Sequence, residues 1–158
     1  MTTDSVFNTI FETSLRVLVL LDEADIALDT ETIVAVDFVA TYGKVFALSE
    51  VSANGDNALM FCELDSRRRL VKDAVKSLVL KGCVIPTATK KGFVYRLLLR
   101  GRQFAESLHS SYSREYREAV RRALETVDEK GSQALFAAID MKSELLVTEG
   151  LHDERLFD

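Results

Sequence analysis

The sequence predicts a mainly α-helical protein with a small β-hairpin, arranged as a winged-helix domain with a C-terminal helical extension. Two observations predict this class. Helical patterns come before a single hairpin pattern, and a long helical pattern follows it. The length of 158 residues suits one domain with an appended helical arm. We expect residues 1–100 to form the winged-helix domain, residues 101–150 the extension, and residues 151–158 a flexible tail.

Two helices are expected in the first part of the chain. The first covers about residues 10–23 and begins at a capping box, in which Thr9 and Glu12 satisfy free N–H groups of the first turn. The second covers residues 30–42, with Asp29 as its N-cap. The β-branched residues of this second stretch also fit a strand, but its length and its capping residue favour a helix.

A third, basic helix is expected over residues 66–81. Asp65 or Ser66 is expected to cap it, and Gly82 to end it. Its apolar residues recur at helical spacing and its charged residues occupy the other faces. In a winged-helix domain this is the position of the recognition helix, the helix that enters the major groove of DNA.

A hairpin follows the basic helix at once. The stretches CVIPTA and FVYRLLL have the composition of two strands, and TKKG joins them, so Lys90 and Lys91 lie at the predicted tip. From Gly101 onward the pattern is helical again, as one long helix or as two with a break at Ser110 and Ser111. A last amphipathic helix is expected after Gly131.

Positive charge is concentrated in the basic helix and the hairpin. Eleven of the 20 Lys and Arg residues lie between Arg67 and Arg102, with only one of the 25 Asp and Glu residues, Asp73. The net charge of the whole chain is nevertheless −5, so one basic segment stands in an acidic protein. The candidates for contact with DNA or with a partner are Arg67, Arg68, Arg69, Lys72, Lys76, Lys90, Lys91, Arg96, Arg100 and Arg102.

Three interpretations of this basic segment stay open. It could contact DNA phosphates without regard to sequence, and it could read base sequence, although the helix offers no Asn or Gln for adenine edges. It could equally meet an acidic protein or solvate a helix face. Beyond the hairpin, apolar residues exceed what a small winged helix needs, so they could cover the core or bind a partner helix. These partner-helix candidates are Tyr112, Tyr116, Phe136, Ile139 and Leu145.

Other function classes lack support in the sequence. No apolar run reaches the length of about 18 residues that a membrane span requires, and the N-terminus lacks the basic start of a secretory signal. Cys62 and Cys83 are too few for a disulfide framework or a zinc site, and we expect reduced thiols in a cytoplasmic protein. His109 and His152 have no obvious nucleophile or orienting carboxylate beside them. We therefore expect no catalytic site, no metal and no cofactor.

The chain resembles the middle components of bacterial ABC-three component systems, most closely type 2, and Lamassu-like defence operons carry a similar small subunit. The resemblance covers about residues 6–128 and includes Asp37-Phe38 and the Arg- and Leu-rich third helix. It also includes the starting pattern FNT…E…LR, formed by Phe7, Asn8, Thr9, Glu12, Leu15 and Arg16. Such proteins often have Pro where this chain has Ile10, and their loop differs from SEVSANGDNALMF.

The resemblance implies a non-enzymatic adaptor subunit. Such a subunit links an SMC-like ABC ATPase to an effector, often a nuclease, in defence against phages or plasmids. Contact with DNA would then be mainly through phosphates, and ATP hydrolysis and DNA cleavage would belong to the partners. The alternative is a stand-alone winged-helix transcriptional regulator that binds DNA by itself.

Overall fold

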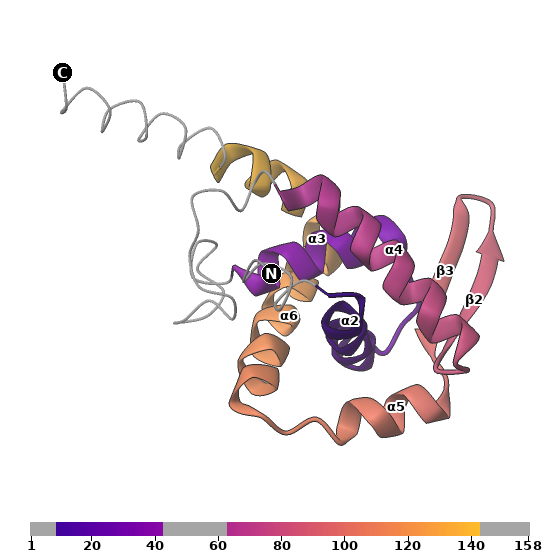
Figure 1. Cartoon of the computed structure of the whole chain (residues 1–158). Coiled ribbons are helices and arrows are strands. Elements are labelled where there is room, and N and C mark those ends of the chain that lie inside the picture. Colours follow the sequence, from indigo (N-terminus) through magenta and orange to yellow (C-terminus); the bar gives the residue numbers. More distant parts are fainter. Residues whose placement is uncertain (1–8, 43–62, 143–158) are drawn as a thin grey trace.

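The computed structural model describes residues 9–42 and 63–142, in which several helices pack together with a small antiparallel sheet at one side (Figure 1). The elements, in chain order, are α2 (Ile10–Ala24), β1 (Leu28–Asp29), α3 (Thr30–Thr41), α4 (Leu64–Leu80), β2 (Val84–Thr89), β3 (Gly92–Leu97), α5 (Leu99–Glu106) and α6 (Ser111–Lys130). Residues 133–142 are also helical. The mainly helical class with a small sheet is therefore confirmed.

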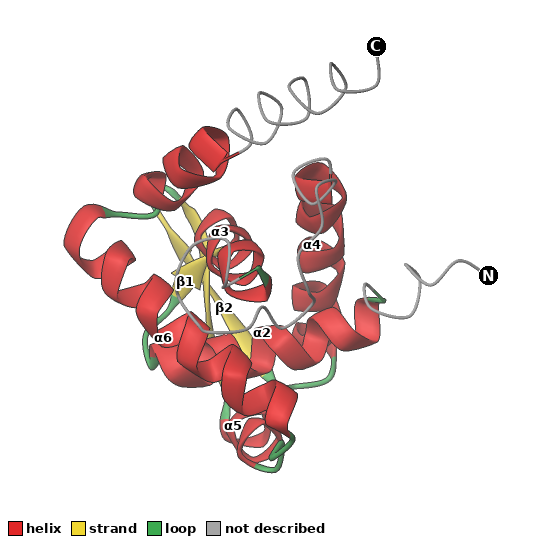
Figure 2. Ribbon diagram, turned by 90° about the vertical axis from the view of Figure 1, so that its left-hand side faces the viewer, coloured by secondary structure: helices red, strands yellow, loops and turns green. Residues whose placement is uncertain are grey.

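The sheet has three strands in the order β1-β3-β2, one more than the predicted hairpin (Figure 2). The additional strand, β1, pairs Leu28 with Tyr95 and Asp29 with Val94 of β3. Two residues are too few to show the alternation by which a strand is recognised in a sequence, which is why the hairpin alone was predicted. The hairpin itself is confirmed, because β2 and β3 pair antiparallel along their whole length.

The starts of the first two helices are confirmed by their capping bonds. The Thr9 hydroxyl oxygen accepts a hydrogen bond of 3.1 Å from the backbone N–H of Glu12. An Asp29 carboxylate oxygen accepts one of 2.7 Å from the N–H of Thr32. These bonds satisfy N–H groups that have no partner inside a helix, and they fix where the chain turns into each helix.

Helix α4 begins earlier than the sequence predicts. Glu63 precedes its first residue and makes no side-chain capping bond, whereas Asp65 and Ser66 lie inside the first turn, so the predicted cap is wrong. Asp65 instead accepts a hydrogen bond from Arg68, three residues on. The end is as predicted, since Gly82 follows the helix with φ of 72°, a conformation that glycine adopts without strain.

The predicted long helix after the hairpin is divided into α5 and α6. Ser110 caps α6 by accepting a hydrogen bond of 3.1 Å from the N–H of Ser113, so the break falls where the two serines predict it. The predicted domain boundary at residue 100 falls within α5. Helix α6 buries Tyr116 and Val120 in the same core as α2 and α3, so the described part of the extension packs directly on the helices before the hairpin.

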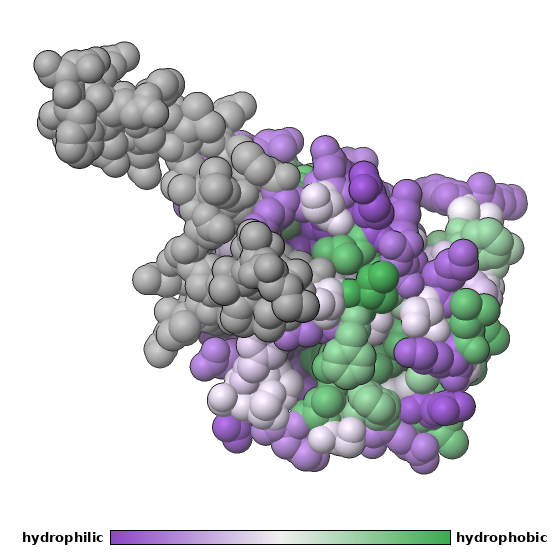
Figure 3. Space-filling view, in the orientation of Figure 1, coloured by the Kyte–Doolittle hydropathy of each residue, from purple (hydrophilic) through white to green (hydrophobic). Residues whose placement is uncertain are grey.

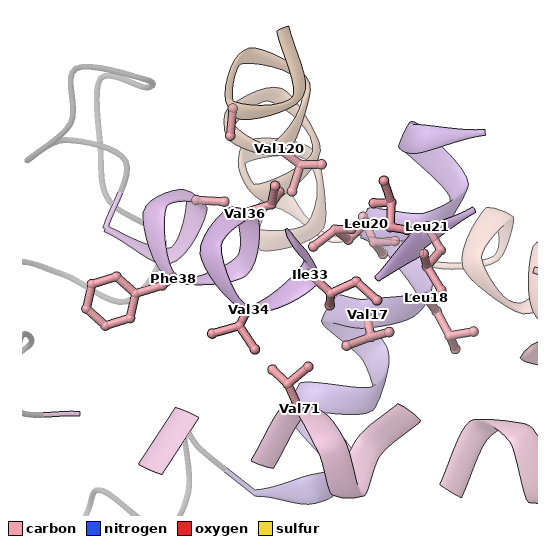
Figure 4. Close-up of a cluster of buried hydrophobic side chains, with 14 of the residues drawn as sticks. Val17, Leu18, Leu20, Leu21, Ile33, Val34, Val36, Phe38, Val71 and Val120 are labelled. Carbon is pink, nitrogen blue, oxygen red and sulfur yellow. The ribbon is translucent and has the colours of Figure 1, made fainter. Parts of the chain in front are cut away.

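Helix α3 lies at the centre of the core. All its residues from Thr32 to Thr41 are buried, because α2, α4 and α6 pack around it. Figure 4 shows the resulting cluster, to which α2 contributes Val17 and Leu20 and α4 contributes Val71. Burial on all sides explains why a stretch rich in β-branched residues forms a helix here, because tertiary packing overrides the weak local preference for strand.

Candidate functional site

The structure separates the ten basic candidates into a paired group and an unpaired group. Arg67, Arg68 and Arg102 make ion pairs with carboxylates of the same chain. The other seven are exposed side chains that make no ion pair with any described residue, namely Arg69, Lys72, Lys76, Lys90, Lys91, Arg96 and Arg100. The unpaired cations among the candidates are therefore fewer than the sequence suggests.

Arg67 is a core residue and cannot contact DNA or a partner, which corrects its place among the candidates. Its side chain is 1% exposed. Its Nη1 donates hydrogen bonds of 3.1 Å to an Asp37 carboxylate oxygen and 2.9 Å to the Thr41 hydroxyl. The guanidinium also lies over the rings of Phe38 and Tyr42. The reason is helical spacing, because Arg67 lies on the same face of α4 as the buried residue Val71, four positions later.

Asp37 is the centre of a buried polar network. Its carboxylate accepts hydrogen bonds of 2.9 Å from Nε of Arg16, 3.1 Å from Arg67 and 2.6 Å from the Tyr116 hydroxyl. Burial alone would raise the pKa of Asp37, but the two guanidiniums and the donated hydrogen bonds together lower it to about 2. Asp37 is therefore charged, and it ties α2, α4 and α6 to the central helix α3.

The network has more positive than negative charge. Burial would lower the pKa of Arg16, but Asp37 outweighs this and raises it, while burial beside Asp37 raises the pKa of Tyr116 well above its usual range. Two charged guanidiniums thus face one buried carboxylate, with Glu63 at 3.9 Å from Arg67 as a further, half-buried carboxylate. A buried charge must be compensated, so the two guanidiniums depend on the Asp37 carboxylate.

Asp22, Glu23 and Asp25 form an acidic cluster at the end of α2, and this cluster is also paired. Arg117 donates hydrogen bonds of 2.9 Å to Asp22 and 3.1 Å to Glu23. Arg102 reaches Asp22 and Asp25 at 3.3 and 3.0 Å. These arginines belong to α5 and α6, so the cluster fastens the helices after the hairpin to the end of α2.

An apolar groove of about 460 Å³ lies between α4 and the hairpin, beside the unpaired cations. Figure 3 shows hydrophilic and hydrophobic side chains mixed on this side of the molecule. Leu80 and Phe93, at 78% and 57% exposed, are large apolar residues on its rim. Its lining is Thr30, Lys72, Val75, Lys76, Val79, Leu80, Pro86, Phe93 and Tyr95. Nothing in the sequence indicates this groove, because its two walls are brought together only by folding.

Two of the partner-helix candidates are core residues. Tyr116 and Ile139 are buried, so their burial within the chain explains their apolar spacing and corrects their assignment to a partner surface. Phe136 is half-buried under the guanidinium of Arg68, 5.4 Å from its ring centre. Tyr112 is partly exposed and stacks on Tyr116, and it lines a small cavity of about 120 Å³ beside Arg16. Leu145 lies outside the described residues.

His109 is exposed between α5 and α6, and His152 lies outside the described residues. Among residues 9–42 and 63–142, no group of three or more potential metal ligands comes together. No helix in those ranges combines the length and the hydropathy that a membrane span needs.

Comparison with known proteins gives a family match. The family model described as ABC-three component (ABC-3C) system Middle Component 2 matches residues 6–149. No curated protein and no solved structure matches the chain. The family match covers the core network, the unpaired cations and the groove, and also reaches past residue 128, where the resemblance from sequence ended.

Proposed function

Because the chain belongs to the Middle Component 2 family of ABC-three component (ABC-3C) systems, we propose that it is the non-catalytic adaptor subunit of a defence complex in the cytoplasm. In this proposal it links an SMC-like ABC ATPase to an effector nuclease, in a system of the Lamassu type that acts against phages or plasmids. ATP hydrolysis and cleavage of nucleic acid are assigned to the partners. The chain contributes binding surfaces and needs no cofactor.

A winged-helix arrangement is part of this proposal. The element order α2, β1, α3, α4, β2, β3 supports it, and in this proposal α4 takes the place of the recognition helix and the hairpin is the wing. Helices α5 and α6 and the helical residues 133–142 then form the C-terminal extension. In this scheme α3 supports both the recognition helix and the extension, because α4 and α6 each pack on it.

The observation that carries the proposal is the division of the charges. Carboxylates of this chain pair with Arg67, Arg68, Arg102 and Arg117, whereas the seven unpaired cations on α4, the hairpin and the start of α5 have no such partner among the described residues. An excess of unpaired positive charge on neighbouring elements attracts and orients a surface of the opposite sign. An acidic protein partner, or phosphates of DNA held by the ATPase, would meet this side.

Assembly tests the proposal. When the tagged chain is co-expressed with the ATPase and effector components of its own system, we expect them to elute together as one complex in size-exclusion chromatography. A chain that elutes alone, while the other two components still associate with each other, would contradict an adaptor role.

The second candidate is a stand-alone winged-helix regulator, which the exposed cations of α4 and of the hairpin tip favour. The two candidates differ in DNA binding by the isolated chain. For the adaptor we expect weak binding that is the same for duplexes of different sequence and that falls steeply as salt rises, because phosphate contacts release counterions. Fluorescence anisotropy with several labelled duplexes measures this. Tight binding that depends on sequence at physiological salt would favour the regulator instead.

A further inference from the structure

We infer that the groove between α4 and the hairpin binds an acidic, amphipathic segment of another protein subunit. The inference rests on the proposed adaptor function and names the kind of partner that one surface receives. Three features of the structure carry it: an apolar hairpin face that continues beyond the core, a matching stripe on α4, and the sign of the charges along the groove.

The hairpin contributes an apolar face that is only partly used by the core. Side chains of paired residues point to the same face of a sheet, and every second pair shares that face. Val84 pairs with Leu97 inside the core, Pro86 with Tyr95 one step outward, and Ala88 with Phe93 near the tip. The apolar face therefore extends past the core, where Phe93 remains 57% exposed.

Helix α4 contributes the opposite wall. Lys72, Val75, Lys76, Val79 and Leu80 line the groove at spacings of three and four residues, so they form one stripe along the helix. Leu80 ends this stripe and is 78% exposed. A helix that ends in an exposed apolar side chain, facing an exposed apolar strand face, is typical of a site that receives another chain.

The charges of the groove select an acidic occupant. Lys72 and Lys76 are the charged residues of its lining in the described part of the chain. Neither makes an ion pair there, and Lys90 and Lys91 lie further along the hairpin, at its tip. DNA phosphates could neutralise these cations but would leave Leu80 and Phe93 in water. A peptide with apolar residues on one face and carboxylates beside them satisfies both walls, because it buries the apolar stripe and pairs the lysines.

Photo-crosslinking within the assembled complex tests this inference. A photoreactive benzoylphenylalanine is placed at Phe93, and in a matched control at Ile26, which has the same exposed fraction of 57% but lies outside the groove. We expect position 93 to crosslink to a segment of another subunit that contains both carboxylates and apolar residues, and position 26 not to reach that segment. Crosslinking of position 93 to DNA, to a second copy, to the chain's own residues or to nothing would overturn the inference.

Two sets of variants make the test quantitative. We expect the combination Leu80→Asp and Phe93→Asp to weaken binding of the chain to its complex about tenfold or more, and Ile26→Asp to leave the affinity within about twofold. The combination Lys72→Glu and Lys76→Glu should also weaken binding. Replacing the acidic residues of the crosslinked segment by Lys should then restore binding to this variant. Normal affinity in the Leu80 and Phe93 variant would overturn the groove assignment while leaving the adaptor function intact, whereas failure of the native chain to assemble would overturn the adaptor function itself.

Discussion

Asp37→Ala is expected to cause the largest loss of stability of any single substitution considered for this chain, about 3–5 kcal/mol in the free energy of unfolding. Asp37 is fully buried and accepts hydrogen bonds from Arg16, Arg67 and Tyr116. Without the carboxylate, two guanidiniums remain buried with no adequate counter-charge, and an uncompensated buried charge is costly. Since domains are typically stable by about 5–15 kcal/mol, much of the stability would be lost. Urea unfolding followed by circular dichroism measures the change.

Asp65→Ala is the matched control for this prediction. Asp65 also accepts a hydrogen bond of 3.0 Å from an arginine, but its side chain is 92% exposed. Surface ion pairs contribute about 0–1 kcal/mol, so this variant should unfold close to the parent chain. Replacing Arg16, Asp37 and Arg67 together by Met, Leu and Met removes all three charges and should restore part of the loss. An Asp37→Ala chain within about 1 kcal/mol of the parent would contradict the account of the network.

Gly101→Val is expected to destabilise the chain by about 1–3 kcal/mol or more, the second largest effect. Gly101 lies in α5 directly against the backbone carbonyl of Cys83, at the start of the hairpin, and any Cβ at position 101 would meet that oxygen. The clash is with backbone rather than with a flexible side chain, so α5 or the strand must move. Thermal unfolding measures the loss as a lower midpoint.

Arg100→Ala provides the comparison for Gly101→Val. Arg100 is the preceding residue of α5 and is exposed, so its truncation should leave the unfolding midpoint almost unchanged. Equal midpoints for the Gly101→Val and Arg100→Ala chains would show that α5 does not approach the hairpin as closely as the structure has it.

Local signals in the sequence predicted most of the helices. Thr9 and Asp29 are capping residues and determine helix starts through bonds to residues three positions on, so a single sequence is sufficient to find them. Gly82 is likewise a local signal for a helix end. Strand β1 gave no such signal, because it exists only by pairing with β3, far along the chain.

The sequence alone does not distinguish the paired cations from the unpaired ones. Arg67 precedes Val71 by one helical step on the buried face of α4, although the sequence prediction placed it among the charged residues of the other faces. Its partner, Asp37, stands 30 positions away along the chain, and a single sequence contains no sign of that pairing. The groove could not be predicted from the sequence either, because Leu80 and Phe93 line one groove only when the hairpin folds back along α4.

The most direct test of the account compares two charge reversals of equal size in the assembled complex. One variant carries Arg69→Glu, Lys72→Glu and Lys76→Glu on α4, and the other carries Arg114→Glu, Arg122→Glu and Lys130→Glu on α6, all at exposed positions. The affinity of each chain for the other components of its system is measured by titration. We expect the α4 variant to bind about tenfold or more weakly and the α6 variant to bind nearly as well as the parent. Equal affinities for the two variants would contradict the claim that the unpaired cations of α4 are where the chain meets its partners.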